Sequence, residues 1–474
     1  MHDVLVIGGG PGGYATAFRA AARGLDVGLV ERDEVGGTCL HRGCVPSKAI
    51  LYVAGVLDEV NRAERLGLRV HSEGIDGAGL DAFRSSVVAG LHQGLEGLVR
   101  KRTTAYAGHG RVERGTDGWE VEVTGADGEA RRVAARNVVL ATGSMPRHLP
   151  GIAVDHEVVQ TSNDALWFTE PPGRALIIGA GAIGLEFASM WAPMGTELTV
   201  VEAQERVLPL EDVDSSRTLS QLLRRRGVEV LTSAMVDEVR VESETATVLL
   251  THDGKQLRRE VDRVLVAVGR GPNTADTGAA ELGVLDDAGF VHTDAAGQTE
   301  LPGLWAVGDV RPTLALAHAA FAEGLVVADR IAGLDTPPVN HEHTPRVTYT
   351  HPEVASVGLT EAQARERHGD DAVATSTSSL RGNAQGLLAG GDGFVKVVHL
   401  REGTPVGALG EGGPVVGVHI VGPHATDLIA EATLATAWEA VPAELAAITH
   451  AHPTLYEALG EAFASAAGLP LHAH

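Results

Sequence analysis

The chain is poor in cysteine and lysine, carries no excess of positive charge and lacks long apolar runs. Two cysteines among 474 residues exclude a framework of structural disulfides. A net charge of −24 argues against binding to nucleic acid or to anionic membranes, which attract basic patches. No apolar run reaches the roughly 18 residues that span a bilayer. The first residues run directly into a strand-like segment without a signal peptide, which predicts a cytoplasmic protein.

The composition is that of a large globular protein. Hydrophobic residues make up 44% of the chain, and one core stops growing at roughly 250–300 residues, so about three domains are expected. Only four of the 38 basic residues are lysines: Lys48, Lys101, Lys255 and Lys396. A lysine in such an arginine-rich chain is expected to stand where an ammonium group is specifically required.

An internal repeat is the clearest pattern. Gly8, Gly10 and Gly13 follow an apolar strand-like segment and open a helix-like stretch, and Glu31 ends the next strand-like segment. The same spacing recurs later in the chain, at Gly179, Gly181, Gly184 and Glu202. Each copy reads as a βαβ unit, which predicts parallel sheets.

Later segments indicate how the two units are connected. Strand-like segments end at 143, 269 and 309, so the first unit is interrupted by the second and resumed after it. From about residue 344, short alternating segments and helix-like stretches predict an α+β domain. The predicted fold is α/β, with two Rossmann-like dinucleotide-binding domains, the second inserted in the first, and a C-terminal α+β domain. The predicted boundaries are 1–146, 147–269, 270–344 and 345–474.

Both repeat copies have the parts of a dinucleotide site. The glycines allow a tight turn, close approach of a pyrophosphate and close helix–strand packing, and the acid accepts hydrogen bonds from ribose hydroxyls. A carboxylate at Glu202 repels a 2′-phosphate, which favours NAD over NADP. Two such sites in one chain predict two cofactors that exchange electrons, most simply a flavin and a nicotinamide.

Both cysteines lie in one short segment, Gly36 to Lys48, directly after the first unit. A Cys39–Cys44 disulfide would close so short a loop that it stabilises the chain by only roughly 2 kcal/mol. Pro46 suits the first turn of a helix, which would place Cys44 at the helix N-terminus, where a thiolate is stabilised. A redox-active pair is the favoured interpretation. The alternatives are two buried thiols or half of a metal site, and the latter lacks further cysteines, so no metal is predicted.

The segment GGTCLHRGCVPSK and the repeat together resemble the pyridine nucleotide–disulfide oxidoreductase family, most of all its dihydrolipoamide dehydrogenases, over essentially the whole chain. The resemblance implies that Cys39 exchanges with the substrate sulfur and that Cys44 forms a thiolate against FAD. The family often has Asn-Val where this chain has His41 and Arg42, which is expected to put a cation beside the disulfide.

The resemblance also assigns cofactor contacts. Lys48 corresponds to a lysine beside the flavin that pairs with a glutamate, here Glu186. Asp309 corresponds to the residue that holds the ribityl chain, and Glu31 to the residue that holds the adenosine ribose. The remaining predicted cofactor-binding residues are Thr38, Gly110, Thr142, Gly143, Ile183, Gly269 and Ala317.

A candidate base lies near the C-terminus. Thiol–disulfide exchange at neutral pH needs a base, and His452 with Glu457 could form a His–carboxylate dyad. With 21 histidines this is weak by itself, but HxHPTLxE resembles the base motif of the family. The resemblance implies a homodimer in which the dyad serves the other subunit's disulfide, and it leaves His450 structural. Ala458 stands where glutathione-type reductases have a second glutamate.

The resemblance predicts an NAD-dependent flavoenzyme that oxidises protein-bound dihydrolipoamide to lipoamide, with FAD and NAD as cofactors. Its expected partners are a second copy and the lipoyl-bearing components of a 2-oxoacid dehydrogenase complex. Three alternatives remain open. Mercuric reductase lacks support because this chain has no C-terminal cysteine pair. A disulfide reductase for a low-molecular-weight thiol and a mainly structural subunit are the others.

Overall fold

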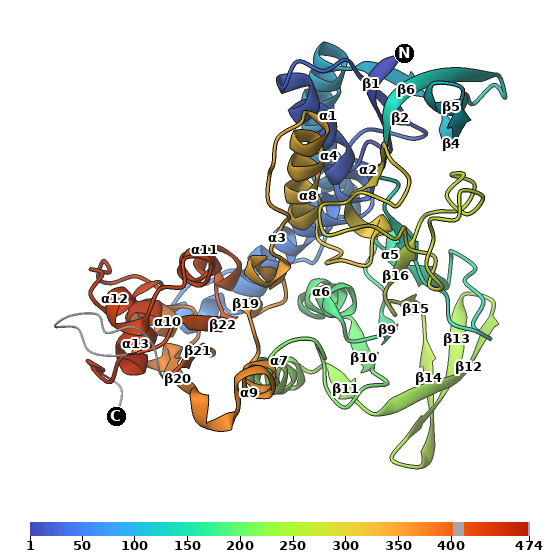
Figure 1. The fold of residues 1–474 in the computed structure, drawn as a ribbon. Helices are drawn as coiled ribbons and strands as arrows, with labels where there is room; N and C mark the ends of the chain where they lie inside the picture. The colour runs from blue at the N-terminus through green and yellow to red at the C-terminus, as the bar shows by residue number, and fades with distance from the viewer. Residues whose placement is uncertain (402–411, 473–474) are drawn as a thin grey trace.

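Three lobes make up the computed structural model, which describes residues 1–401 and 412–472. Figure 1 shows the N-terminal and central segments in the upper lobe, the green second segment at the lower right and the orange-to-red C-terminal segment at the lower left. Each lobe has a sheet of its own. The α/β architecture with a separate C-terminal α+β domain is therefore confirmed.

The sheet of the upper lobe is assembled from two separate parts of the chain. Its order is β3-β2-β1-β6-β5-β4, and β17 pairs with β6 in parallel. Because β17 follows the second lobe in sequence, the second domain is inserted in the first, as predicted. The strands are β1 (His2–Ile7), β2 (Val27–Glu31), β3 (Thr104–Ala107), β4 (His109–Gly115), β5 (Gly118–Thr124), β6 (Ala130–Leu140) and β17 (Leu304–Ala306).

Two helices pack against each other on this sheet, α1 (Pro11–Ala22) and α8 (Ala317–Ile331). The apolar run Val4–Ile7 in β1 is buried, as expected for a central strand of a parallel sheet that is covered on both faces. The segment 270–344, predicted as a central domain, contributes β17 and α8 to this lobe.

The second lobe has a parallel sheet of order β11-β10-β9-β15-β8 and an antiparallel three-stranded sheet. The parallel strands are β8 (Val159–Thr161), β9 (Arg174–Ile178), β10 (Glu197–Val201), β11 (Glu229–Leu231) and β15 (Arg263–Val266). The antiparallel strands are β12 (Ala234–Glu242), β13 (Thr245–His252) and β14 (Lys255–Val261). The helices are α5 (Ser162–Ala165), α6 (Ala182–Trp191) and α7 (Val213–Arg225).

The third lobe is an antiparallel sheet of order β18-β19-β22-β21-β20 with helices packed on it. Its strands are β18 (Arg346–Thr348), β19 (Glu353–Gly358), β20 (Val373–Ser379), β21 (Phe394–Leu400) and β22 (Val415–Gly422). Its helices are α9 (Glu361–His368), α10 (Ala384–Leu388), α11 (Ala425–Ala437), α12 (Pro442–Ala446) and α13 (Glu457–Ala466).

Connecting elements join the lobes. The short strands β7 (Ser144–Pro146) and β16 (Arg270–Pro272) pair where the chain enters and leaves the second lobe. The helices α2 (Gly37–His41), α3 (Cys44–Asn61) and α4 (Gly77–Arg102) follow the first βαβ unit, and α3 contacts α6 of the second lobe. The 3-10 helices are η1 (Ala63–Leu66), η2 (Ala192–Met194), η3 (Gly308–Val310), η4 (His341–His343), η5 (Asp370–Ala372) and η6 (Leu380–Gly382). Among the described residues, no helix combines the length and apolar character needed to cross a membrane.

Candidate active site

Two positions of the first glycine turn have room only for glycine. Gly8 has a φ of +106°, and a Cβ atom there would lie 2.3 Å from the carbonyl oxygen of Ala141. A Cβ atom at Gly13 would lie 1.8 Å from the carbonyl oxygen of Gly8, whereas one at Gly10 would meet nothing within 4 Å. The turn thus packs α1 tightly against β1 and leaves an open face at the helix N-terminus, which is the geometry that admits a pyrophosphate.

The second turn repeats this geometry. Gly179 has a φ of +105°, and its Cβ atom would lie 2.4 Å from the carbonyl oxygen of Ala267. A Cβ atom at Gly184 would lie 2.0 Å from the carbonyl oxygen of Gly179, and Gly181 again faces open space. The internal repeat of the sequence is therefore a repeat of structure.

The two acids occupy equivalent places. Glu31 accepts a hydrogen bond of 2.6 Å from the backbone N–H of Gly9. Glu202 accepts the matching bond of 2.7 Å from the backbone N–H of Ala180. Each carboxylate is thereby held at the end of its strand, next to the turn where a ribose would lie.

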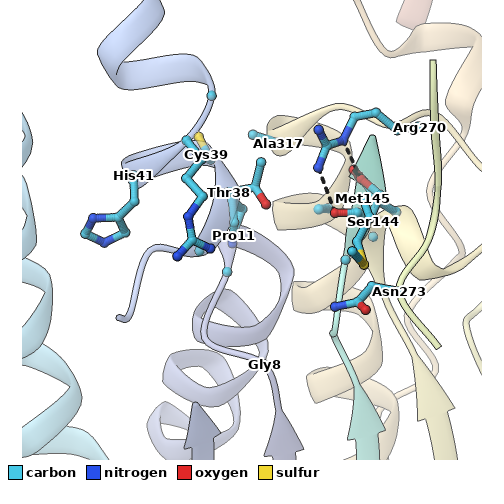
Figure 2. A pocket seen from close by; sticks show the side chains of 18 of the residues that line it. Gly8, Pro11, Thr38, Cys39, His41, Ser144, Met145, Arg270, Asn273 and Ala317 are labelled. Carbon is cyan, nitrogen blue, oxygen red and sulfur yellow. Dashed lines mark hydrogen bonds between the residues drawn. The ribbon is translucent and has the colours of Figure 1, made fainter. Parts of the chain in front are cut away.

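A cavity of about 450 Å³ opens beside the first turn. Figure 2 shows Gly8, Thr38 and Cys39 on one side of it, and Ser144 and Arg270 across from them. The predicted residues that line it are Gly8, Gly10, Glu31, Thr38, Cys39, Cys44, Lys48, Gly110, Thr142, Gly143, Ile183, Glu186, Asp309 and Ala317. The predicted residues outside its lining are Gly13, Gly179, Gly181, Gly184, Glu202, Gly269, His452 and Glu457.

The polar groups of the cavity suit a flavin dinucleotide. The hydroxyl of Thr142 is buried without a hydrogen-bond partner among the described residues. Leaving such a group unpaired costs about 1–3 kcal/mol, so a polar ligand is expected there. Asp309 accepts a 2.6 Å hydrogen bond from the hydroxyl of Ser144, and Arg270 donates to the same hydroxyl at 2.7 Å. A carboxylate fixed in this way can accept hydrogen bonds from a polyhydroxylated chain.

The cysteines lie on neighbouring helices, Cys39 in α2 and Cys44 as the first residue of α3. The position of Cys44 confirms the helix start inferred from Pro46. A hydrogen bond from Cys39 lowers the pKa of Cys44 to about 7, and the nearby charge of Lys48 acts in the same direction while burial opposes it. The same hydrogen bond, together with burial, raises the pKa of Cys39. Of the two thiols, Cys44 is therefore the one that ionises first as the pH rises.

Lys48 and Glu186 form the predicted pair. The Lys48 ammonium lies 2.9 and 2.8 Å from the two carboxylate oxygens of Glu186. Glu186 also accepts a 3.0 Å hydrogen bond from the backbone N–H of Tyr349, and the Tyr349 ring centroid lies 4.4 Å from the Lys48 nitrogen. The pair thus joins α3 of the first lobe, α6 of the second and the third lobe.

The expected cation, Arg42, lines the same cavity as the two cysteines. The Arg42 guanidinium is half-exposed and forms an ion pair with Asp33 at 3.1 Å. His41 bonds through Nε2 to the carbonyl oxygen of Val35 at 2.9 Å, and Figure 2 shows its ring directed away from Arg270. The charge of Arg42 is therefore partly offset by a neighbouring acid, and its effect on the sulfur atoms stays a prediction.

His452 and Glu457 form the predicted dyad, with 3.0 Å between Nδ1 and the carboxylate. Asn383 donates a 3.1 Å hydrogen bond to the other carboxylate oxygen of Glu457, which orients it. His452 is largely exposed, and Figure 1 places α13 in the lower-left lobe, far from α2 in the upper lobe. The structure therefore does not bring the dyad to the cysteines of the same chain. The His450 side chain is only 8% exposed and bonds to Glu431 at 3.0 Å, so the structural role expected for it stays a prediction that this contact supports.

Comparison with known proteins decides the family. Residues 2–324 match the pyridine nucleotide-disulphide oxidoreductase family, and residues 344–463 match the dimerisation domain of that family. The chain belongs to the pyridine nucleotide-disulphide oxidoreductase family. It is thus a flavoprotein oxidoreductase with FAD and NAD as its cofactors.

Relatives within this family match over nearly the full length. The chain is 36% identical to a dihydrolipoyl dehydrogenase of Bacillus subtilis, with 99% of each chain covered. It is 38% identical to the dihydrolipoyl dehydrogenase of Cupriavidus necator, covering 98% of this chain and 97% of the relative. The crystal structure of LpdA from Mycobacterium tuberculosis is similar with a TM-score of 0.88 at 28% identity, covering 98% of this chain and 99% of that one.

Some residues at this oxidoreductase site were not found from the sequence. Arg270 lies across the cavity from Cys39, and its position directly after a strand-ending glycine was the one available signal. Tyr14 lies in α1, where burial, followed by the charge of Cys39, raises its pKa to about 12. Tyr349 comes from the third lobe, and no local pattern marks it.

Proposed function

We propose that the enzyme oxidises dihydrolipoamide to lipoamide with NAD⁺. The observation that carries the proposal is the pair of cysteines at the cavity, in which Cys44 has a pKa of about 7 and Lys48 and Glu186 lie beside it. Similar proteins with near-complete coverage are named dihydrolipoyl dehydrogenases, which supports this substrate over a low-molecular-weight disulfide.

The proposed exchange needs only residues of the chain. His452 takes the proton of one substrate thiol, and the resulting thiolate attacks the Cys39 sulfur. The Cys39–Cys44 bond breaks and Cys44 leaves as a thiolate. The second substrate thiol passes its proton to Cys39 as its sulfur attacks the first, so that lipoamide is released, Cys39 leaves as a thiol and His452 keeps the first proton. Two electrons then reside on the cysteine pair.

The cofactors would be held by the two glycine turns. Gly8, Gly10, Gly13 and Glu31 would bind the FAD dinucleotide, and Asp309 and Thr142 would bind its polar linker. FAD supplies the two-electron relay between the cysteine pair and NAD⁺. Lys48 would place a positive charge beside the flavin ring, and Glu186 would fix the position of its ammonium group.

The second turn would bind NAD⁺. Glu202 is buried and leaves no place for a 2′-phosphate beside its carboxylate. The nearest basic candidate, Arg206, donates to the carbonyl oxygen of Pro209 at 2.8 Å and so is engaged elsewhere. We therefore infer that NAD⁺ is used in preference to NADP⁺.

A substrate panel tests the activity. With NAD⁺, dihydrolipoamide should be oxidised at least tenfold faster than with NADP⁺, and oxidised glutathione should not be reduced by NADH. Cys44→Ser should abolish turnover yet retain FAD, because it removes the leaving thiolate and not the glycine turns. Faster reduction of glutathione than of lipoamide, or turnover by the variant, contradicts the proposal.

We also propose that the active unit is a homodimer in which His452 and Glu457 act on the cysteines of the other subunit, since the dyad lies far from the cysteines of its own chain. The lipoyl group would arrive on a component of a 2-oxoacid dehydrogenase complex.

Mixed dimers test this sharing. A heterodimer of one Cys44→Ser subunit and one His452→Ala subunit contains one site with both groups intact, if sites form across the two-fold axis. Differently tagged subunits allow its purification, and about half of the wild-type activity is expected. Each homodimeric variant is the control and should be inactive. An inactive heterodimer would show that the dyad serves its own chain.

A further inference from the structure

The loop between β18 and β19 brings the third lobe to the redox centre. The backbone N–H of Tyr349 donates to Glu186 at 3.0 Å, and that of His351 donates to the hydroxyl of Ser189 at 3.1 Å. Both acceptors lie on α6, and Val347 of β18 lines the cavity. The loop is thus fixed against the second lobe at two points on either side of Thr350.

The ring of Tyr349 contacts the side of the Lys48 ammonium that does not bind Glu186. An ammonium group has three N–H donors, and the two carboxylate oxygens of Glu186 lie at 2.9 and 2.8 Å from it. The ring centroid lies 4.4 Å from the same nitrogen, within the range of a cation–π interaction. The ring therefore offers a negative face without a second formal charge.

The neutrality of the ring matters for the centre. Burial raises the pKa of Tyr349, and the charge of Lys48 opposes this effect. The acids Glu353, Glu186 and Asp427 raise the pKa by smaller amounts, so the phenol stays uncharged. Glu186 already balances the charge of Lys48, so a carboxylate at this position would give the cluster a net negative charge. A neutral ring orients the ammonium without adding that second negative charge beside Cys44.

We propose that Tyr349 is a positioning residue that holds the Lys48 ammonium toward Cys44, so that the third lobe completes the redox centre. This inference rests on the proposed function only for the role of Cys44 in turnover. Its physical consequence is independent of any substrate. Without the ring, Lys48 gains freedom and water enters beside it, and both effects weaken its stabilisation of the Cys44 thiolate.

The test compares Tyr349→Leu, which removes the ring, with Tyr349→Phe, which keeps it. Holoenzyme is reduced with one equivalent of dithionite, and no dihydrolipoamide is added. The thiolate of Cys44 is followed from pH 5.5 to 9.5 by the long-wavelength absorbance that a thiolate produces beside oxidised flavin. Iodoacetamide alkylation of Cys44, mapped by mass spectrometry, gives a second and independent measure of the thiolate fraction.

Tyr349→Leu should raise the titration midpoint by roughly half to one unit and slow Cys44 alkylation at pH 7 by about 2- to 5-fold. Tyr349→Phe should match the wild type. If Tyr349→Leu fails to bind FAD or to fold, Tyr349→Met fills a similar volume without a ring and takes its place. An unchanged midpoint in the ring-free variant overturns the proposal. So does an equal shift in Tyr349→Phe, because the hydroxyl would then be the active part. Failure of dihydrolipoamide oxidation by the wild type would instead count against the proposed function alone.

Discussion

Lys48 and Lys396 are two of the four lysines of the chain, and each binds carboxylates at a junction between lobes. Lys396 is almost fully buried, and its nitrogen lies 2.9 Å from Asp212, 2.7 Å from Asp214 and 2.7 Å from Glu361. Lys48 is about one-third exposed at 32% and has one carboxylate, Glu186, and one aromatic face.

The difference lies in how completely each ammonium is satisfied. Three carboxylates match the three donors of Lys396, and they come from α7 of the second lobe and α9 of the third, while Lys396 itself is in β21. Such a group has no donor left for a ligand, so its role is structural: it is a joint, by which we mean a side chain that holds two lobes together. Lys48 faces the cavity with part of its charge unshared, so it can act on a thiolate or a cofactor.

Replacing Lys396 should give the largest effect on stability. Lys396→Met leaves three carboxylates without their shared cation, and breaking a buried ion pair costs roughly 3–5 kcal/mol. Hydrogen exchange in α7 and α9 should accelerate accordingly, while turnover per folded molecule stays near that of the wild type. Lys396→Arg is the matched control and should lose less, because it keeps the charge although its planar group cannot meet all three acceptors. Unaltered exchange in Lys396→Met would contradict the assignment of a joint.

Replacing Lys48 should have the opposite effect, with a large loss of turnover and a small loss of stability. Lys48→Met removes the charge beside Cys44, and turnover should fall by about 10²-fold, as for loss of one oriented electrostatic group. The loss of stability should be smaller than for Lys396→Met, because only one buried carboxylate loses its cation and Glu186 keeps the backbone N–H of Tyr349 as a donor. Turnover and thermal unfolding of the same preparation give both numbers. A variant that is unstable but fully active would make Lys48 the structural lysine.

The pH dependence separates the two clusters further. The pKa of Cys44 is about 7, so activity should fall close to tenfold per unit below that value as the thiolate is protonated. Hydrogen bonding by Lys396, against burial, lowers the pKa of Glu361. A carboxyl group whose pKa is lowered by folding stabilises the fold at pH values above the pKa of the unfolded chain, about 4.3 for Glu. This stabilisation is lost as the pH falls through the pKa of the folded state. Between pH 6.5 and 5, activity should therefore drop while the ion pairs of Lys396 persist, which unchanged protection of α7 and α9 in hydrogen exchange would show.

The sequence predicted the fold where the signal is local. The glycine spacing in both turns is set by atoms close in sequence, because a Cβ atom at Gly13 or Gly184 would meet the carbonyl oxygen of Gly8 or Gly179. Pro46 likewise marked the start of α3 at Cys44. The roles assigned to the individual site residues remain predictions, although the predicted pairs Lys48–Glu186 and His452–Glu457 are in contact.

The direction of side chains was harder to predict. Arg42 stands between the two cysteines in sequence and lines the cavity with them, but its guanidinium pairs with Asp33, an acid that the sequence pattern did not single out. A long flexible side chain pairs with the nearest accessible opposite charge, and its sequence neighbours do not determine which charge that is.

The sequence by itself determined the two nucleotide turns, the place of Cys44 at a helix start and the family, because each depends on spacings of a few residues. Only the tertiary structure decided which lysine is a joint and which faces the cavity. It also placed Tyr349 at Lys48 and separated His452 from the cysteines of its own chain. The contacts of Lys48 with Glu186 and of Lys396 with Asp212 and Asp214 join residues more than a hundred positions apart. They arise from the packing of three lobes, which short-range spacing does not encode.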